Sequence, residues 1–248
     1  MESSSVTLLV QTLKAELLAI STEQKAAASR RYFPQGVEVI GATAADIKAV
    51  AKSFHANHLL TAEQTLAVTE QLLAQAKFSE EKLLAFALLN KFVARHFDES
   101  LFQRFEFWLE HYADNWSLVD DLCIKTLYQF LLKRPHLIEH TQHWSRSKVS
   151  WCRRASCVVW VKFIERKIGK GVYRLNPELV FDNCQRLIND DDEFVQKGVG
   201  WLLKVTAVHH PEKVKAFIKQ NIKRLERSTL RYAIEKFDKA TRQQILAW

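Results

Sequence analysis

Glycine and proline are scarce in this chain of 248 residues. Six glycines and four prolines make up about 4% of the chain, against a usual share of about 12%. A loop that wraps phosphates needs several glycines close together, and neither G-x-G-x-x-G nor G-x-x-x-x-G-K-S/T occurs. The sequence therefore argues against nucleotide-cofactor chemistry on a Rossmann or P-loop scaffold, and we expect no cofactor.

The chain also lacks paired cysteines, an export leader and long apolar runs. Its four cysteines, Cys123, Cys152, Cys157 and Cys184, form no C-x-x-C pair of the kind that a zinc ribbon needs. No cationic and then apolar leader opens the chain, and no apolar run approaches the roughly 20 residues of a membrane span. We therefore expect a soluble protein of a reducing, bacterial-type cytoplasm, with no metal and no membrane partner.

Positive charge is concentrated in the C-terminal part. Residues 1–143 hold 14 Lys and Arg against 17 Asp and Glu, whereas residues 144–248 hold 22 against 11. The second segment alone thus carries a net charge of +11, more than the +8 of the whole chain. A field of this sign favours a polyanionic partner, because neutralised phosphates release their condensed counterions. A merely soluble basic surface is the alternative on charge alone.

Hydrophobic residues recur at spacings of three and four residues nearly everywhere. Examples are Leu8, Leu9, Leu13, Leu17 and Leu18, and later Leu83, Leu84, Ala87, Leu88 and Phe92. No stretch shows the two-residue alternation of a half-buried strand. Together with a composition rich in Leu, Ala, Lys, Glu, Gln and Arg, this pattern predicts an all-α protein.

Similar helix starts and similar helix interiors repeat along the chain. Pro135, Pro177 and Pro211, which are 42 and 34 residues apart, each begin a predicted first helix. Farther along, Arg154-Ala155 and Lys197-Gly198 each place a cation beside a small residue that allows close helix approach. A two-helix unit that repeats about every 34–43 residues is typical of a HEAT-like solenoid.

We therefore predict a right-handed α-α superhelix built of HEAT-like helical pairs. The predicted pairs, which follow an N-terminal helical cap at about 6–52, are 61–96, 99–133, 136–167, 177–208 and 211–247. The second helix of each pair is expected to line a concave face. No Ser/Gly-rich linker interrupts the pattern, so residues 1–248 are predicted to form one domain.

Four side chains fall on predicted second helices and suit a nucleotide. Trp116 and Asp120 are four residues apart, which places an indole and a carboxylate on one face of one helix. Arg154 and Trp201 come from the next two predicted second helices. Each residue has an ordinary alternative, since a single tryptophan is usually part of a core and a single aspartate usually caps a helix or faces solvent.

Three motifs extend this set into a family resemblance. They are Trp116-Ser117-Leu118-Val119-Asp120, residues 151–155 (WCRRA) and residues 194–203 (FVQKGVGWLL), and the match continues through residues 210–214, 217–221 and 232–236. With a weaker match at Arg31-Tyr32 and at the turn of residues 41–46, most of the chain resembles the AlkD family, the alkylpurine DNA glycosylases built from HEAT-like repeats.

The resemblance implies roles for individual residues. Asp120 matches the catalytic carboxylate, Arg154 the phosphate-binding arginine, and Trp116 and Trp201 the aromatics that pack against the damaged nucleotide. Tyr32 is similar to an N-terminal aromatic that meets DNA, although a core position is an equal alternative. Further candidate DNA-binding residues are Arg153, Lys197, Lys204 and Arg231.

The sequence departs from the family pattern at a few positions. Asn115 stands where a second aromatic residue is expected, and Ser117 where an acidic residue is expected. Thr43-Ala44-Ala45 replaces a Thr-Pro helix start. These departures bear on the N-terminal contacts and on the range of lesions more than on the reaction.

The implied reaction is consistent with elementary chemistry. An N3- or N7-alkylated purine, such as 3-methyladenine or 7-methylguanine, is already cationic, so its glycosidic bond is weak and the leaving base needs no general acid. One ionised carboxylate then suffices to stabilise the oxocarbenium-like sugar and to position water. The expected partner is double-stranded DNA that contains such a lesion. We expect the base to be excised without base flipping, in base excision repair. The enzyme is expected to be a monomer that associates with the nucleoid when it is bound to DNA.

Two other functions remain as alternatives at this point. A non-catalytic HEAT-repeat protein would bind damaged, bent or branched DNA without cutting it. A protein-interaction scaffold is the common use of such solenoids, although Arg154 and Lys197 on the predicted inner helices argue against it.

Three further features have modest interpretations. We interpret the acidic run of residues 190–193 as a helix cap. His136, His140 and His143 share one predicted helix face but lack a carboxylate or cysteine partner for a metal. The cations between Lys213 and Arg231 suit a phosphate backbone or a solvated helix face equally.

Overall fold

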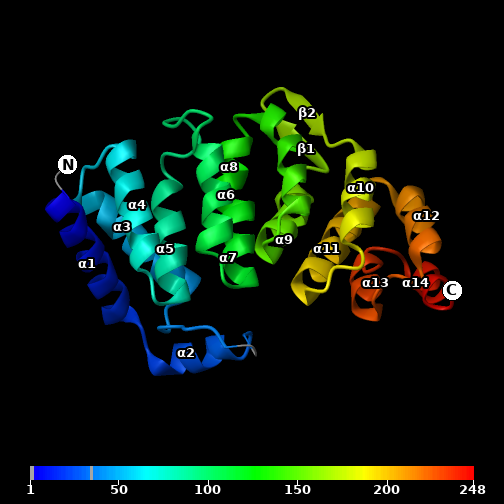
Figure 1. The fold of residues 1–248 in the computed structure, drawn as a ribbon, viewed down its shortest axis with the longest axis horizontal. Helices are drawn as coiled ribbons and strands as arrows, with labels where there is room; N and C mark the ends of the chain where they lie inside the picture. Colours follow the sequence, from blue (N-terminus) through cyan, green and yellow to red (C-terminus); the bar gives the residue numbers. More distant parts are fainter. Residues whose placement is uncertain (1–2, 34–35) are drawn as a thin grey trace. The chain divides into compact units, whose positions relative to one another are not determined.

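The computed structural model describes residues 3–33 and 36–248, and the described chain is predominantly helical. It divides into two compact units, residues 1–130 and residues 131–248, which are described one at a time. The predicted all-α fold class is confirmed: helices pair in each unit (Figure 1), and a small two-stranded sheet is the exception within the described residues. The expectation that the chain forms one domain stays a prediction.

The first unit consists of helices that follow the predicted cap and the first two predicted pairs. They are α1 (Ser3–Ile20), α2 (Glu23–Arg30), α3 (Ala44–Asn57), α4 (Ala62–Gln75), α5 (Ser79–Leu89), α6 (Leu101–His111), α7 (Trp116–Asp121), the π-helix η1 (Leu122–Thr126) and α8 (Leu127–Leu131), whose last residue falls in the second unit. Helix α5 packs on α3 and α4, and also on α7 and η1. Its buried residues therefore connect the N-terminal helices to the helix that carries Trp116 and Asp120.

A buried carboxylate holds the segment before α3 against the start of α5. Glu80 is only 4% exposed, and its Oε atoms accept hydrogen bonds from the backbone N–H groups of Ile40 (3.0 Å), Gly41 (2.9 Å) and Ala42 (3.4 Å). The backbone N–H of Ser79 in turn donates to the carbonyl of Glu38 (2.9 Å). The loop is thus fixed without regular secondary structure.

Thr43 begins α3 although no proline follows it. Its hydroxyl accepts a hydrogen bond from the N–H of Asp46, and the Asp46 carboxylate accepts one from the N–H of Thr43, which completes a capping box. The hydrogen bond from Lys25, with those from Thr43, lowers the pKa of Asp46 to about 2, so this cap stays ionised at neutral pH. The departure at residues 43–45 therefore still starts a helix.

The second unit has two layers of helices. Its members are the 3-10 helices η2 (Pro135–Leu137) and η3 (Glu139–Arg146), then α9 (Ser150–Val158), the 3-10 helix η4 (Val159–Lys162), α10 (Pro177–Leu187), α11 (Glu193–His209), α12 (Pro211–Asn221), α13 (Arg227–Ala233) and α14 (Lys239–Leu246). One layer, the first-helix layer, contains η3, α10 and α12. The other, the second-helix layer, contains α9, α11 and α13, and α11 lies between the other two (Figure 1).

Two glycines on opposite sides of α11 permit this close packing. A Cβ on Gly198 would lie 3.5 Å from the Cβ of Cys157 and 3.6 Å from the Cγ of Arg154, both on α9. A Cβ on Gly200 would lie 3.1 Å from the carbonyl oxygen of Thr229 and 3.3 Å from Tyr232, both on α13. The predicted close approach at Gly198 is thus present, and Gly200 makes a tighter one that the sequence pattern did not reveal.

The second unit also contains a small hairpin, which the sequence pattern did not predict. Strands β1 (Glu165–Ile168) and β2 (Gly171–Arg174) form an antiparallel hairpin in which Ile168 pairs with Gly171. Gly169, with φ +60°, opens its two-residue turn, as glycine does in type II′ turns. Six of the eight strand residues are exposed, and Ile168 and Tyr173 are only partly buried. The strands therefore carry no clear apolar alternation from which they could be predicted. The predicted pair at 136–167 therefore ends in this hairpin.

The predicted helix at Pro135 consists of the 3-10 helices η2 and η3 instead of an α-helix. Its buried side chains Ile138, Thr141 and Trp144 recur every three residues, which matches the 3-10 period. The Thr141 hydroxyl adds a hydrogen bond to the carbonyl of Ile138 (2.7 Å). Pro177 and Pro211, in contrast, begin α-helices as predicted.

The Glu80 contacts give a first test. Glu80→Gln replaces one acceptor oxygen by an NH2 group that faces backbone donors, so we expect the free energy of unfolding to fall by about 1–3 kcal/mol. Urea denaturation measures this change, and hydrogen exchange should accelerate at the amides of Ile40 and Gly41. Glu110→Gln, at an exposed site on α6, is the control. Equal urea midpoints for the two variants would show that the hydrogen bonds of Glu80 do not stabilise the fold.

The two glycines of α11 give a second, matched test. Gly198→Ala places its methyl group at ordinary contact distances and gains helix propensity, so we expect stability to rise by about 0.5–1 kcal/mol. Gly200→Ala forces its methyl group against the backbone of α13, so we expect a loss of about 1–3 kcal/mol instead. Thermal unfolding of both variants checks the order, and a Gly200→Ala protein as stable as Gly198→Ala would refute it.

Candidate functional site

Trp116 and Asp120 lie on α7 of the first unit, as predicted. Asn115 is the N-cap of this helix, and its Oδ1 accepts hydrogen bonds from the N–H groups of Ser117 (3.0 Å) and Leu118 (3.2 Å). Its Nδ2 donates to the Ser79 hydroxyl (3.1 Å) on α5. The departure from an aromatic at position 115 thus supplies a buried cap that orients the start of α7.

The indole of Trp116 rests on the segment after α2. Its Nε1 donates to the backbone carbonyl of Tyr32 (3.4 Å), and its ring lies 5.6 Å from the ring of Phe33. Tyr32 is 69% exposed, so the core position considered for it is wrong. Sequence reasoning missed Phe33, because a contact between residues 33 and 116 has no local signal.

A π-helical turn begins two residues after Asp120. Residues Leu122–Thr126 form the π-helix η1, a rare geometry that is frequent at functional sites. Asp121 next to Asp120 pairs with Lys125, and burial raises the pKa of Asp121. Asp120 and Asp121 are both of intermediate burial. The proposed catalytic residue thus lies beside a helix irregularity that the sequence alone does not indicate.

Arg153 and Arg154 on α9 also differ. The Arg153 guanidinium donates two hydrogen bonds to the Asp190 carboxylate, from Nε (2.6 Å) and from Nη2 (3.0 Å). Its NH1 donates to the carbonyls of Ser147 and Lys148. The side chain that we predicted to bind DNA is thus engaged inside the second unit. The acidic run of residues 190–193 supplies the cap of α11, as predicted, through Asp192.

Arg154 contacts the backbone at the start of α11. It is 5% exposed, and its NH1 donates to the carbonyl of Phe194. The Phe194 ring lies 5.7 Å from that of Trp151, and the Nζ of Lys197 is 4.7 Å from the centre of the Phe194 ring. Arg154 and Lys197 are therefore brought together around Phe194.

The remaining candidates lie farther along the second-helix layer. Trp201 on α11 is partly buried, whereas the fully buried tryptophans are Trp108, Trp144 and Trp160. Lys204 pairs with Glu235 and lies over the ring of Tyr232. Arg231 on α13 is exposed. In the basic stretch near α12, Lys213 pairs with Glu178 and Lys215 with Glu212.

The described residues offer no reactive thiol and no cluster of metal ligands. Burial raises the pKa of Cys157 to about 12 and also raises the pKa of Cys184, so both stay protonated. All four cysteines are buried and form no disulfide. Throughout residues 3–33 and 36–248, His, Cys, Asp and Glu side chains form no group of three that suits a metal ion.

No helix of the described chain is long and apolar enough to cross a membrane.

These features define a class: helical-repeat proteins whose second helices carry tryptophan, carboxylate and arginine side chains. Residues 13–237 match the protein family described as DNA alkylation repair enzyme. Because this match covers most of the chain, the protein belongs to the DNA alkylation repair enzyme family. A search of curated proteins finds no match.

Two solved structures share the fold. A predicted DNA alkylation repair enzyme from Enterococcus faecalis has a TM-score of 0.75 and 18% identity, with 88% of this chain and 97% of that chain covered. The alkylpurine DNA glycosylase AlkC of Pseudomonas fluorescens, bound to DNA that contains an abasic site analog, has a TM-score of 0.55 and 18% identity, with 96% of this chain and 64% of that chain covered. At this identity the two structures support the fold alone.

The contacts of Arg153 give a test that separates structure from binding. Arg153→Gln removes the charged partner of Asp190, whose side chain is 7% exposed, so we expect the free energy of unfolding to fall by about 2–3 kcal/mol. Denaturant unfolding measures this loss. Arg242→Gln, at an exposed site on α14, removes the same charge as a control. Unchanged stability in Arg153→Gln would restore Arg153 as a candidate DNA contact.

Proposed function

We propose that this protein is a DNA glycosylase that excises cationic N3- and N7-alkylated purines from duplex DNA. The observation that carries the proposal is the placement of Trp116 and Asp120 on one capped helix of a protein from the DNA alkylation repair family. The AlkC structure, an alkylpurine DNA glycosylase on DNA with an abasic site analog, supports DNA as the partner.

Asp120 is the proposed catalytic residue. When the bond from the sugar to a cationic purine breaks, positive charge grows on the deoxyribose while the base leaves as a neutral molecule. A carboxylate beside the sugar stabilises that charge and positions the attacking water. Because the leaving base needs no proton, the reaction needs no general acid. A reaction without a general acid does not require the base to reach one in a pocket. We therefore propose that the base reacts without being flipped.

Aromatic and cationic side chains are the proposed binding groups. Indole faces of Trp116 and Trp201 attract a cationic base by about 0.5–2 kcal/mol each. Arg154 suits a phosphate through its planar fork, and the Phe194 carbonyl already orients one of its nitrogens. Tyr32, Lys197, Lys204 and Arg231 are the proposed peripheral DNA contacts. The basic segment 144–248 supplies long-range attraction for the duplex.

Asp120→Asn tests the proposal. At saturating protein, we expect single-turnover release of 7-methylguanine from a one-lesion duplex to slow by about a hundredfold or more, because one preorganised electrostatic group is lost. Binding of the duplex should remain, since the substitution removes no phosphate contact.

The control is Asp121→Asn, which removes a neighbouring carboxylate of α7 and should retain most of the rate once its folding is verified. Release of neither 7-methylguanine nor 3-methyladenine by the wild type, with duplex binding intact, would replace the glycosylase by a non-catalytic DNA-binding function. Absence of salt-dependent DNA binding would instead favour a protein scaffold.

A further inference from the structure

A second polar site lies on the first-helix layer of the second unit. A groove of about 230 Å³ runs between η3 and α10, and we call it the η3–α10 groove. Its lining is entirely polar or charged: Glu139, His140, Gln142, His143 and Arg146 from η3, and Arg186 from α10. Every lining residue therefore offers a polar or charged group to a ligand.

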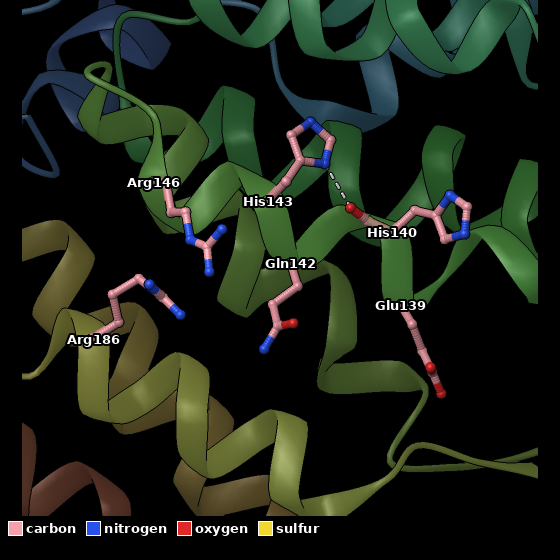
Figure 2. Close-up of a pocket in the computed structure, with 6 residues that line it drawn as sticks. All are labelled: Glu139, His140, Gln142, His143, Arg146 and Arg186. Atoms are coloured by element: carbon pink, nitrogen blue, oxygen red, sulfur yellow. Dashed lines mark hydrogen bonds between the residues drawn. The ribbon is translucent and has the colours of Figure 1, made fainter.

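Two guanidinium groups face this groove from opposite walls. Figure 2 shows Arg146 and Arg186 extending from separate helices into the same space, with Gln142 beside them and Glu139 at the other end. Both arginines are exposed, and within the described residues neither has a hydrogen-bond or ion-pair partner. Many cations of this unit do have one, for example Arg153 with Asp190 and Lys213 with Glu178.

Other contacts keep the walls in place. Gln142 Nε2 donates to the carbonyl of Leu179 on α10 (3.3 Å), so one side chain bridges the two helices. His143 Nδ1 lies 2.6 Å from the carbonyl oxygen of His140. Because a carbonyl oxygen only accepts, Nδ1 is the donor in this hydrogen bond. The adjacent Trp144 is fully buried and anchors η3. The two arginines thus project from a fixed frame.

The chemistry of the pair favours a phosphate group. Two guanidinium groups in one groove repel each other, and an anion between them removes that repulsion. A carboxylate has two oxygens, which a single guanidinium fork already satisfies. A phosphate has additional oxygens for the second fork. The cations in the lining also make the groove unsuitable for a metal ion.

The groove is separate from the residues of this unit that are proposed to bind the damaged nucleotide. Arg154 and Trp201 lie on α9 and α11 of the second-helix layer, whereas the groove lies on η3 and α10. We propose that the η3–α10 groove is a phosphate-binding site, independent of base excision. The phosphate belongs either to a free phosphate or phosphomonoester, or to the backbone of a second DNA segment.

Titration with inorganic phosphate tests the site. Full-length protein labelled with 15N is titrated at constant ionic strength, and the Nε–H signals of Arg146 and Arg186 are followed by NMR. We expect saturable shifts of both signals. Arg186→Gln should weaken binding by about tenfold or more, because it removes a charge-assisted contact, and Arg146→Gln/Arg186→Gln should abolish it.

Matched variants separate a built site from general charge. Arg242→Gln removes one positive charge elsewhere and should leave the affinity unchanged. Arg186→Lys keeps the charge but loses the fork, so its affinity should lie between those of the wild type and Arg186→Gln. Thermal unfolding verifies that each variant is folded. Absence of saturable shifts, or equal affinity in the wild type and the double variant, would overturn the proposal.

A second arm identifies the source of the phosphate. The protein is held on an immobilised undamaged duplex, and retention of a second, fluorescent duplex is measured. Retention that the double variant loses assigns the groove to a second DNA segment. Phosphate binding without such retention assigns it to a free phosphate or phosphomonoester. Either result supports the site, and neither depends on glycosylase activity.

Discussion

The close contact of α11 with α9 on one side and with α13 on the other is the constraint on which the second unit depends. Gly198 and Gly200 face these two neighbours, and a Cβ at Gly200 would press against the backbone carbonyl of Thr229. The same contact places the start of α11 against Arg154, so that the Phe194 carbonyl meets the guanidinium. Packing and the proposed phosphate contact are therefore set by the same pair of helices.

In the first unit, one buried carboxylate has a comparable role. Glu80 holds the loop before α3 on the start of α5, and α5 also packs on α7. The Ser79 hydroxyl contacts Asn115, the cap of α7, while the Tyr32 carbonyl meets the indole of Trp116. A chain of polar contacts thus connects an irregular N-terminal segment to the proposed lesion-contacting tryptophan.

The distribution of charge acquires meaning only when partners are known. The excess of cations after residue 143 indicates a polyanionic partner, yet several of those cations pair with acids of their own unit. Arg153 and Arg154 illustrate the difference: one grips Asp190, and the other is oriented by a backbone carbonyl. Arg146 and Arg186, which no sequence pattern singles out, meet in the η3–α10 groove because α10 packs on η3.

The sequence by itself determined the helical class, the helix starts at Pro177 and Pro211, and the shared helix of Trp116 and Asp120, because helix periodicity and caps are local properties. Only the tertiary structure decided the contact between Phe33 and Trp116, the pairing of Arg153 with Asp190, and the hairpin at 165–174. Contacts between residues far apart in the chain depend on how helices pack. No strand residue of the hairpin is fully buried, so its strands left no periodic signal to predict.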